Sequence, residues 1–404
     1  MIVRRYLLWA RTATATQRAQ GTSALARAYL QAELSPEDRR EAETALLAAL
    51  DDPSPLVRRA MAVALCDAPD APRALVVGLA GDQSDIAALV LARSPVLTDA
   101  DLVDCAAVGD ALAQTAIALR AELSAPVAAA LAEVGAPEAL VALAGNPGAS
   151  IPASALRRML ERHGEDGDLR EALLARRDLS AATRQTIAGL VAGRLSAFVT
   201  GCGWLSPQRS ERVCREAKER AALALAARLD EADTAAFAAD LCRSGELTLA
   251  LLLRAVLSGA VPFAEACFAL LADLPLARVG GLIHDRRGAG FPALYRRAGL
   301  PRSYLPVFRS AFAAARDIGH GPGGERPALS RAALARVVAE CEMLPAAEAA
   351  PITALLRRFE AEAAREEAQR LADALADDAA LAVIIEHHPE ALADMWDEPR
   401  ALAA

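Results

Sequence analysis

The densest group of side chains that could bind a charged ligand lies between residues 284 and 302. It contains four arginines that we take as candidate ligands, namely Arg286, Arg287, Arg296 and Arg297, together with two nearby glycines. Guanidinium groups bind phosphate or carboxylate oxygens in pairs, and a glycine-rich loop lets backbone N–H groups approach an anion. The spacing matches neither a dinucleotide-binding fingerprint nor a P-loop. We therefore interpret the segment first as a turn between helices whose arginines pair with nearby acids; the alternative is a site for an anionic ligand, either a small nucleotide-like molecule or an acidic peptide.

Histidines and cysteines form no recognisable metal or catalytic motif. His387 and His388 are adjacent, and neighbouring residues of a helix point about 100° apart, so they are poorly placed to share one ion. The seven cysteines include no C-x-x-C pair, which predicts reduced thiols buried in helices. His163 has no identifiable nucleophile partner, and no G-x-S-x-G sequence occurs. We therefore expect no metal, no cofactor and no enzymatic activity, with a site assembled from distant residues as the open alternative.

A third set of polar residues recurs along the first half of the chain. Its members precede expected helix starts by four or five residues and are Arg93, Arg120, Asn146 and Arg176. We interpret them as donors to carbonyl groups at helix C-termini, where positive charge is favoured. The alternative is a groove for an acidic peptide or a nucleic-acid backbone, because equivalent positions of a repeat lie on the same side of a stacked array.

These side chains must be positioned by a repeat of short helices. Residue types that cap helix N-termini recur every 26 to 30 residues, at Asp70, Thr98, Ser124, Ser150 and Ser180. Glycines follow within each of the first four units, and we expect them to end helices in the left-handed conformation: Gly81, Gly109, Gly135 and Gly164. Each unit is therefore predicted to be a helix pair that buries its apolar stripe by stacking on the next pair.

The composition supports an all-α fold. Apolar residues make up 54% of the chain and aromatics only 4%, so the core is expected to consist of Ala, Leu and Val. The segment GCGWLSPQ, residues 201–208, interrupts the repeat, and a glycine-rich loop is expected at 319–327. We predict an α-solenoid of short HEAT-like helix pairs over 1–200, a C-terminal helical bundle over 201–345 and a charged helical tail over 346–404. Helices after the first break are expected at 208–229, 231–243, 247–258, 261–272 and 275–284.

Charge and hydropathy limit the choice of partner and compartment. The net charge is −8, which disfavours general nucleic-acid binding. The apolar run near the N-terminus is too short for the core of a signal peptide. The apolar stretch that begins near residue 245 is interrupted by Arg254, Gly259, Pro262 and Glu265, which predicts two buried helices and no membrane span. We expect a cytoplasmic protein.

Three segments also resemble a known family. DDPSPLVRRA (51–60), LVLARSPVLTDADLV (89–103) and LIHDRRGAGFPALYRRAGLP (282–301) resemble an uncharacterised proteobacterial family, a domain of unknown function with HEAT-like helices. The resemblance covers residues 1–345. It implies the fold and supplies no reaction, ligand or catalytic residue.

Together these patterns favour a non-enzymatic protein-interaction scaffold. Another protein is the expected partner, and self-association through the charged C-terminal helix is the second interpretation. The alternative function is a binding module for an anionic ligand at the 284–302 loop. A third class, an enzyme such as a repeat-type DNA-repair protein, is disfavoured by the negative charge.

Overall fold

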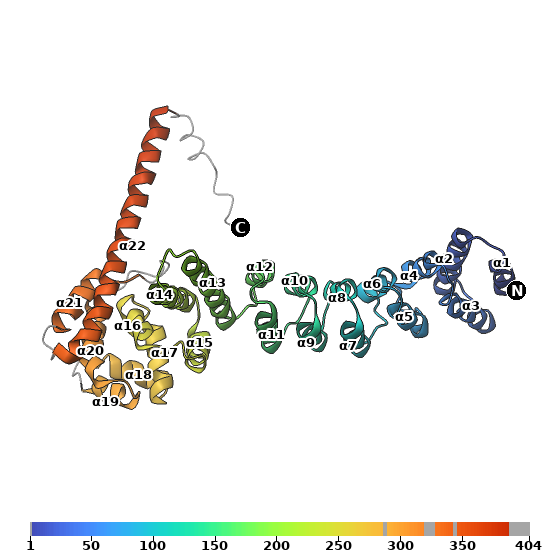
Figure 1. Cartoon of the computed structure of the whole chain (residues 1–404). Helices are drawn as coiled ribbons and strands as arrows, with labels where there is room; N and C mark the ends of the chain where they lie inside the picture. Colours follow the sequence, from blue (N-terminus) through green and yellow to red (C-terminus); the bar gives the residue numbers. More distant parts are fainter. Residues whose placement is uncertain (1, 286–288, 319–327, 342–345, 388–404) are drawn as a thin grey trace. The chain divides into compact units, whose positions relative to one another are not determined.

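The computed structural model describes residues 2–285, 289–318, 328–341 and 346–387. These residues form 22 α-helices and one short 3-10 helix, which confirms the prediction of an all-α fold (Figure 1). Within them, β-type pairing is limited to one parallel bridge between the loop residues Leu123 and Ala149. The loop expected at 319–327 lies outside the described residues. The chain divides into two compact units, Met1–Trp204 (unit 1) and Leu205–Ala404 (unit 2), which we describe separately.

Unit 1 consists of short helices joined by short loops. Its helices are α1 (Ile2–Ala10), α2 (Ala15–Gln31), α3 (Pro36–Ala49), α4 (Pro55–Leu65), α5 (Arg73–Ala80), α6 (Ser84–Arg93), α7 (Asp99–Val108), α8 (Ala111–Ala118), α9 (Ala125–Val134), α10 (Pro137–Gly145), α11 (Ala153–His163), α12 (Gly167–Ala175) and α13 (Ala181–Gly201).

The helices of unit 1 lie in two rows (Figure 1). In one row α2, α4, α6, α8, α10 and α12 follow one another, each in contact with the next, and in the other α7, α9, α11 and α13 do the same. Consecutive helices such as α7 and α8 also touch across the rows. Each helix pair is therefore covered by the next pair, which buries an apolar stripe that a single pair would expose.

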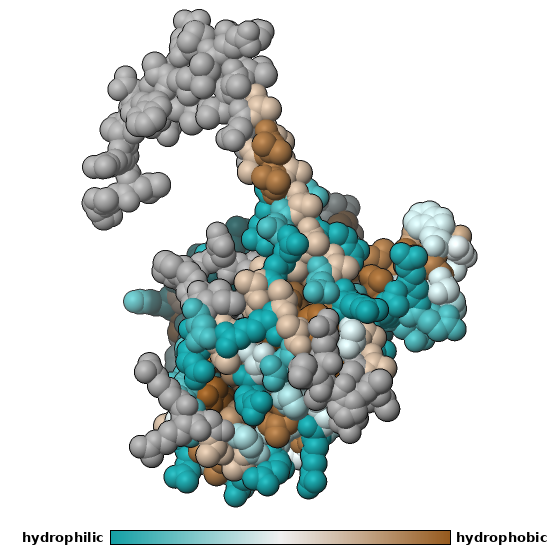
Figure 2. Space-filling view, turned by 90° about the vertical axis from the view of Figure 1, so that its left-hand side faces the viewer, coloured by the Kyte–Doolittle hydropathy of each residue, from teal (hydrophilic) through white to brown (hydrophobic). Residues whose placement is uncertain are grey.

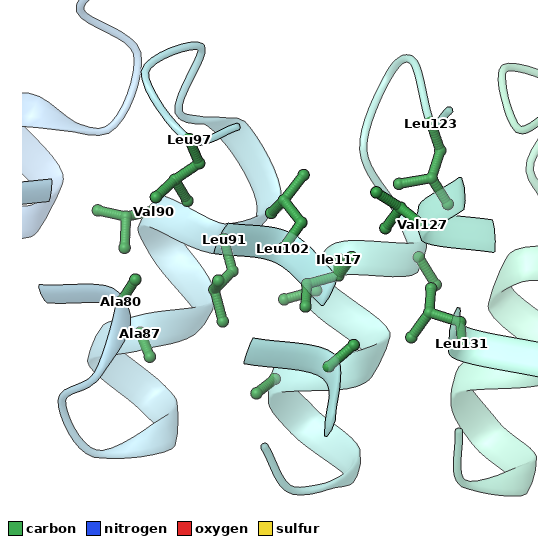
Figure 3. Packing of buried hydrophobic residues seen from close by; sticks show 14 of the residues in the cluster. Ala80, Ala87, Val90, Leu91, Leu97, Leu102, Ile117, Leu123, Val127 and Leu131 are labelled. Carbon is green, nitrogen blue, oxygen red and sulfur yellow. The ribbon is translucent and has the colours of Figure 1, made fainter. Parts of the chain in front are cut away.

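The core of unit 1 is aliphatic, as the composition predicts. Leu91, Ile117, Val127 and Leu131 are fully buried and point toward one another from neighbouring helices (Figure 3). Among the buried core residues described for this unit, Tyr29 is the one aromatic. Close packing of Ala, Leu, Val and Ile along the rows is therefore what holds the helix pairs together.

Two of the five expected helix caps are confirmed, and a third residue holds the cap position alone. Thr98 accepts a hydrogen bond from the backbone N–H of Asp101, and the Asp101 carboxylate accepts one from the backbone N–H of Thr98 at 2.8 Å. Ser180 accepts from the backbone N–H of Thr183 at the start of α13. Ser124 holds the cap position of α9 without a side-chain cap bond. Thr98 and Ser180 therefore each provide an acceptor for a backbone N–H group that the start of a helix leaves unpaired.

The other two expected caps are wrong. Asp70 and Ser150 both precede the true helix starts by several residues, because α5 follows Pro72 and α11 follows Pro152. A proline pushes the residue before it into an extended conformation, so a helix cannot begin two residues earlier.

Glycines do end α5, α7, α9 and α11, but none of the four has the left-handed conformation that was expected. Gly109, Gly135 and Gly164 have φ angles of −73°, −60° and −62°, so none of them is left-handed. A Cβ atom on these residues would lie 2.5, 2.5 and 2.3 Å from the carbonyl oxygen four residues earlier. The missing side chain therefore permits a close approach of the helix end to its own carbonyl. Gly81 ends α5 without such a contact.

Unit 2 contains longer helices. They are α14 (Pro207–Ala226), α15 (Glu231–Arg243), α16 (Leu249–Leu257), α17 (Val261–Ala272), α18 (Leu276–Ile283), α19 (Gly290–Arg297), η1 (Arg302–Tyr304), α20 (Leu305–Ile318), α21 (Arg331–Cys341) and α22 (Ala346–His387). The five helices expected between 208 and 284 are confirmed to within three residues at each end.

The apolar stretch after residue 245 forms two separate helices, α16 and α17, as expected. Among the described helices, none alone has the length and apolar composition to cross a membrane; α17 and α18 reach them only as a pair bent by 112°.

The core of unit 2 is also built mostly of Ala, Leu and Val, but unlike that of unit 1 it contains a cluster of aromatic rings. Phe268 lies with its ring centroid 5.8 to 6.3 Å from those of Phe291, Tyr295, Phe308 and Phe312. Seven of the eight phenylalanines of the chain are buried in this unit. A whole-chain average hides this uneven distribution of aromatic residues, so the expected Ala–Leu–Val core is found in both units and the aromatic cluster of unit 2 is an addition to it.

Candidate functional site

The anion site expected at residues 284–302 is described only in part. Arg286 and Arg287 lie outside the described residues. Arg296 is exposed, and its Nε donates to a carbonyl of its own helix, that of Pro292, at 3.1 Å. His284, at the start of this segment, has Nε2 2.7 Å from the Glu265 carboxylate.

The fourth candidate, Arg297, is engaged in the packing of unit 2. Its Nε donates to the Ala272 carbonyl at 2.5 Å and its Nη2 to the Asp273 carbonyl at 3.3 Å, both at the C-terminal end of α17. Such carbonyls lack partners within their own helix, so Arg297 acts as a C-terminal cap that ties α19 to α17. The anion site stays a prediction for Arg286, Arg287 and Arg296.

The recurring arginines of unit 1 bind carbonyl groups of the preceding helix pair. Arg120 follows α8, and its Nη1 and Nη2 donate to the carbonyls of Leu91 and Ser94 at 2.7 and 2.8 Å, in the last turn and at the C-cap of α6. Burial lowers the pKa of the Arg120 guanidinium from its ordinary value, yet such a group stays charged at neutral pH. A half-buried cation is thus paired with carbonyl dipoles that point at it.

The same contact repeats at the next two helix ends. Asn146 donates through Nδ2 to the carbonyls of Ala118 and Arg120, both at 2.7 Å. Arg176 in turn donates to the carbonyls of Asn146 and Ala149 at 2.8 and 3.0 Å. A chain of side-chain to backbone hydrogen bonds therefore links the ends of α6, α8, α10 and α12, and the interpretation of these residues as carbonyl donors is confirmed.

Arg93 does not share this position and is a correction. It pairs with the Asp67 carboxylate at 3.5 Å, with both side chains largely exposed. The segment before Thr98 is one residue longer than the corresponding segments of the other repeats. Ser94, four residues before Thr98, therefore occupies the position that Arg120 occupies four residues before Ser124. Because the donors of Arg120, Asn146 and Arg176 face carbonyls, they do not form the groove for an acidic peptide or nucleic acid that was the alternative.

Replacing Arg176 with alanine tests this chain of contacts. The buried carbonyls at the ends of α10 and its loop would lose their donor, so we expect unit 1 to lose about 2 kcal/mol of stability. Hydrogen exchange of α10 and α12 at increasing denaturant concentration measures this loss of stability. Arg177→Ala, which removes the exposed neighbouring arginine, is the matched control and should change stability by less than about 0.5 kcal/mol. Equal effects of the two changes would contradict the assigned role.

Unit 2 contains a buried charged cluster that the sequence analysis missed. Arg254 of α16 is 2% exposed and donates through Nη1 and Nη2 to both carboxylate oxygens of Glu362 in α22, at 2.6 and 2.9 Å. Its Nε donates to Glu219 of α14 at 3.2 Å, and its guanidinium lies 4.6 Å above the Phe359 ring. Arg220 adds a second contact to Glu362 at 3.2 Å. Three helices are therefore joined through one arginine.

The charges of this cluster are set by burial and pairing. Burial opposes ionisation of Glu362, but the hydrogen bonds and charge of Arg254, with the charge of Arg220, outweigh it and lower the pKa of Glu362. For Glu219 burial dominates and raises the pKa, although Arg254 acts in the opposite direction. The sequence did hold a signal for this cluster, because a lone arginine within the apolar helix 249–257 requires a buried acid as partner.

The long helix α22 has two parts with different surroundings. In its first part Ile352, Leu356 and Phe359, which lie at helical spacing, are buried against the rest of unit 2. Glu362 lies in the segment expected to be a charged surface, and its burial corrects that expectation. From Ala364 to Ala376 every side chain is exposed except that of Glu366, which is half-buried. We call residues 364–387 the distal part of α22.

The distal part of α22 carries apolar residues on an open surface. Leu371 and Leu375, one helical turn apart, are 61% and 60% exposed. Figure 2 shows this part of α22 extending beyond the rest of unit 2 with a hydrophobic patch along it. The side chains of Gln369 and Arg370 form hydrogen bonds within their own helix. An exposed apolar stripe on a helix is the usual mark of a surface that another helix or groove covers.

Metal-binding and redox groups give no further site within the described residues. No group of three or more His, Cys, Asp or Glu side chains there is placed to hold a metal ion. His388 lies outside the described residues, as does the side chain of His387. All seven cysteines are free, and Cys202 and Cys242 are exposed, so the expectation of buried thiols is wrong for these two.

Comparison with known proteins points to one family. A family model described as "Uncharacterised protein conserved in bacteria (DUF2336)" matches residues 86–350, which run from α6 in unit 1 to the start of α22 in unit 2. No curated protein and no solved structure matches the chain significantly.

Proposed function

The chain belongs to DUF2336, a family of uncharacterised bacterial proteins whose model matches more than half of it, and we propose that it is a non-enzymatic, cytoplasmic protein-interaction scaffold. Its polar side chains with the most buried contacts, those of Arg120, Asn146, Arg176 and Arg254, bind helix-end carbonyls or other helices and so serve the fold. The seven free cysteines suit a reducing compartment.

We infer that unit 1 is an α-solenoid of HEAT-like helix pairs. The two rows of helices and the recurrence of one contact, from Arg120, Asn146 and Arg176 back to the preceding pair, support this classification. Arrays of this kind present long, regular surfaces, which suits binding to another protein. That functional step is an analogy with other repeat proteins.

The observation that carries the proposal is the distal part of α22. A helix that stands alone in water is only marginally stable, so the exposed segment 364–376 would gain stability from a partner. The anchor for this helix is firm, because Glu362 and Phe359 are held in the buried cluster around Arg254. We therefore propose that α22 is a docking helix that is fixed at one end and open at the other.

The charge of the distal part indicates the chemistry of its partner. Residues 371–387 contain four acidic residues and neither arginine nor lysine. A partner that covers Leu371 and Leu375 would bind to an acidic segment of the chain, so a basic amphipathic segment of another protein fits best. Self-association through α22 is the competing prediction, and it would bring like charges together in a parallel pair.

Site-specific photo-crosslinking from position 374 of α22 in living cells tests the proposal. We expect a discrete adduct with another protein, whose crosslinked peptide carries lysine or arginine beside apolar residues at helical spacing. Leu371→Glu with Leu375→Glu should abolish the adduct, because two carboxylates would then be buried against the partner.

The matched control places the same charges on the opposite face of the same helix. Gln369→Glu with Ala376→Glu should leave the adduct unchanged, since both positions are exposed and lie away from Leu371 and Leu375. Adducts only with the chain itself, or equal losses in both double variants, would contradict docking of another protein.

A further inference from the structure

The second half of α13 in unit 1 is apolar, nearly uncharged and exposed. Val191, Leu195 and Phe198 are 47%, 60% and 58% exposed, and their spacing places them on one face of the helix. Trp204, just beyond the helix, is 69% exposed and meets Phe198 edge to face at 5.7 Å between ring centroids. We call Val191, Leu195, Phe198 and Trp204 the α13 stripe. Four large apolar side chains gathered in this way mark a surface that is covered in the working protein.

The charges around the stripe exclude most kinds of partner. Residues 187–204 contain one charged residue, Arg194, whose guanidinium donates to the Glu165 carbonyl. A strongly basic or acidic protein would lose hydration on this face without gaining a counter-charge. A helix that lies on a membrane surface needs lysines or arginines on its polar face, and this segment offers only the engaged Arg194. The partner surface must therefore be apolar and uncharged as well.

The α13 stripe itself has these properties, and its shape matches a second copy. In an antiparallel pair of α13 helices related by a two-fold axis near Leu195, Val191 of each copy lies opposite Phe198 of the other. The smaller Val191 side chain of each copy then faces the larger Phe198 side chain of the other copy, and the two Leu195 side chains meet at the axis. Neither copy brings a charge into the contact.

We propose that two copies of this chain associate through the α13 stripe. The contact is isologous, because each copy contributes the same apolar face. It is separate from the distal part of α22, on which the proposed function rests. The chain would then present two docking helices, one from each copy, so that binding of a repetitive partner gains from effective concentration.

Sedimentation equilibrium of the full chain at micromolar concentration tests the proposal. We expect a dimer for the native sequence, and for Leu195→Glu with Phe198→Glu a dissociation constant raised by ~100-fold or more, since central apolar side chains dominate such contacts. Gly193→Glu with Ala197→Glu is the matched control. Both positions are exposed on the other face of α13, and a Cβ at Gly193 would meet no atom within 4 Å, so this variant should stay dimeric.

A disulfide tests the antiparallel register independently. In a background of Cys202→Ser and Cys242→Ser, which removes the two exposed cysteines, Leu195→Cys should form an intermolecular disulfide, whereas Gly193→Cys should not. A monomeric native chain, or equal dissociation in both glutamate variants, would overturn the proposal. Loss of the dimer in Leu371→Glu with Leu375→Glu would also overturn it and would assign self-association to α22.

Discussion

Replacing Arg254 with methionine is expected to lower the free energy of unfolding of unit 2 by about 3–5 kcal/mol. The change keeps most of the side-chain volume but removes the cation that Glu219 and Glu362 share. Both carboxylates are 6% exposed, so each would be left as a buried charge without its main partner. Denaturant-dependent hydrogen exchange of peptides from α14, α16 and α22 measures the loss in this unit.

The deficit of this variant should depend on pH in a defined direction. In the native protein pairing lowers the pKa of Glu362, so its contribution to stability is present above the unfolded pKa and is lost as the pH falls through the folded one. Without Arg254, burial is opposed only by Arg220 at Glu362 and by Thr248 at Glu219, so we expect the folded pKa of both carboxylates to rise above the unfolded value. A carboxyl group whose folded pKa is raised stabilises the folded state at low pH and destabilises it as the pH rises through that pKa. The deficit should therefore be largest near neutral pH and shrink on acidification.

An exposed arginine provides the matched control for this change. Arg243 of α15 carries a 74% exposed side chain and pairs with Asp240 at the surface. Arg243→Met should alter stability by less than about 0.5 kcal/mol, because exposed pairs contribute little. If Arg254→Met behaved like Arg243→Met, or if its deficit grew as the pH fell, the cluster would not be the junction that holds α22.

Replacing Gly148 with alanine is expected to destabilise unit 1 by about 3 kcal/mol. A Cβ at Gly148 would lie 1.9 Å from the carbonyl oxygen of Ala121, a backbone atom that cannot move aside alone. The two loops would have to separate, which breaks the hydrogen bonds from Leu123 to Gly148 and from Ser150 to Leu123, at 3.1 and 2.9 Å. Thermal unfolding and exchange of the amide of Leu123 report the loss.

The same substitution three residues earlier should have the opposite sign. Gly145 ends α10 with helical backbone, and a Cβ there would meet no atom within 4 Å. Gly145→Ala should therefore stabilise the chain by up to ~1 kcal/mol, because alanine loses less backbone entropy in a helix than glycine. A neutral Gly148→Ala would show that the bridge between the two loops does not link neighbouring helix pairs.

The helix boundaries show how far local sequence carries a prediction. Thr98 and Ser180 begin helices where expected because a cap acts on N–H groups two or three residues away. Asp70 and Ser150 misled because a proline closer to the helix outweighed the capping residue. The glycines ended helices at the expected places, yet Gly109 and its equivalents do so through a contact with the preceding turn, which depends on the three-dimensional course of the chain.

The candidate surfaces were harder to predict than the helices. The apolar run of the α13 stripe was visible in the sequence, but such a run is equally typical of a buried helix, and only exposed fractions separate the two cases. For α22 the charged segment correctly indicated an exposed helix. The burial of Glu362 within that segment could not be read from its neighbours in sequence.

The amino-acid sequence by itself determined that the described part of this chain is all-helical and where most of its helices begin and end, and it favoured recurring donors to helix-end carbonyls over a binding groove. These properties follow from helix propensity, capping and the spacing of apolar residues, all of which act within a few residues. Only the tertiary structure decided which arginines are structural and which surfaces stay open. Arg254 meets acids 35 and 108 residues away, and the environment of a charge depends on all the helices around it.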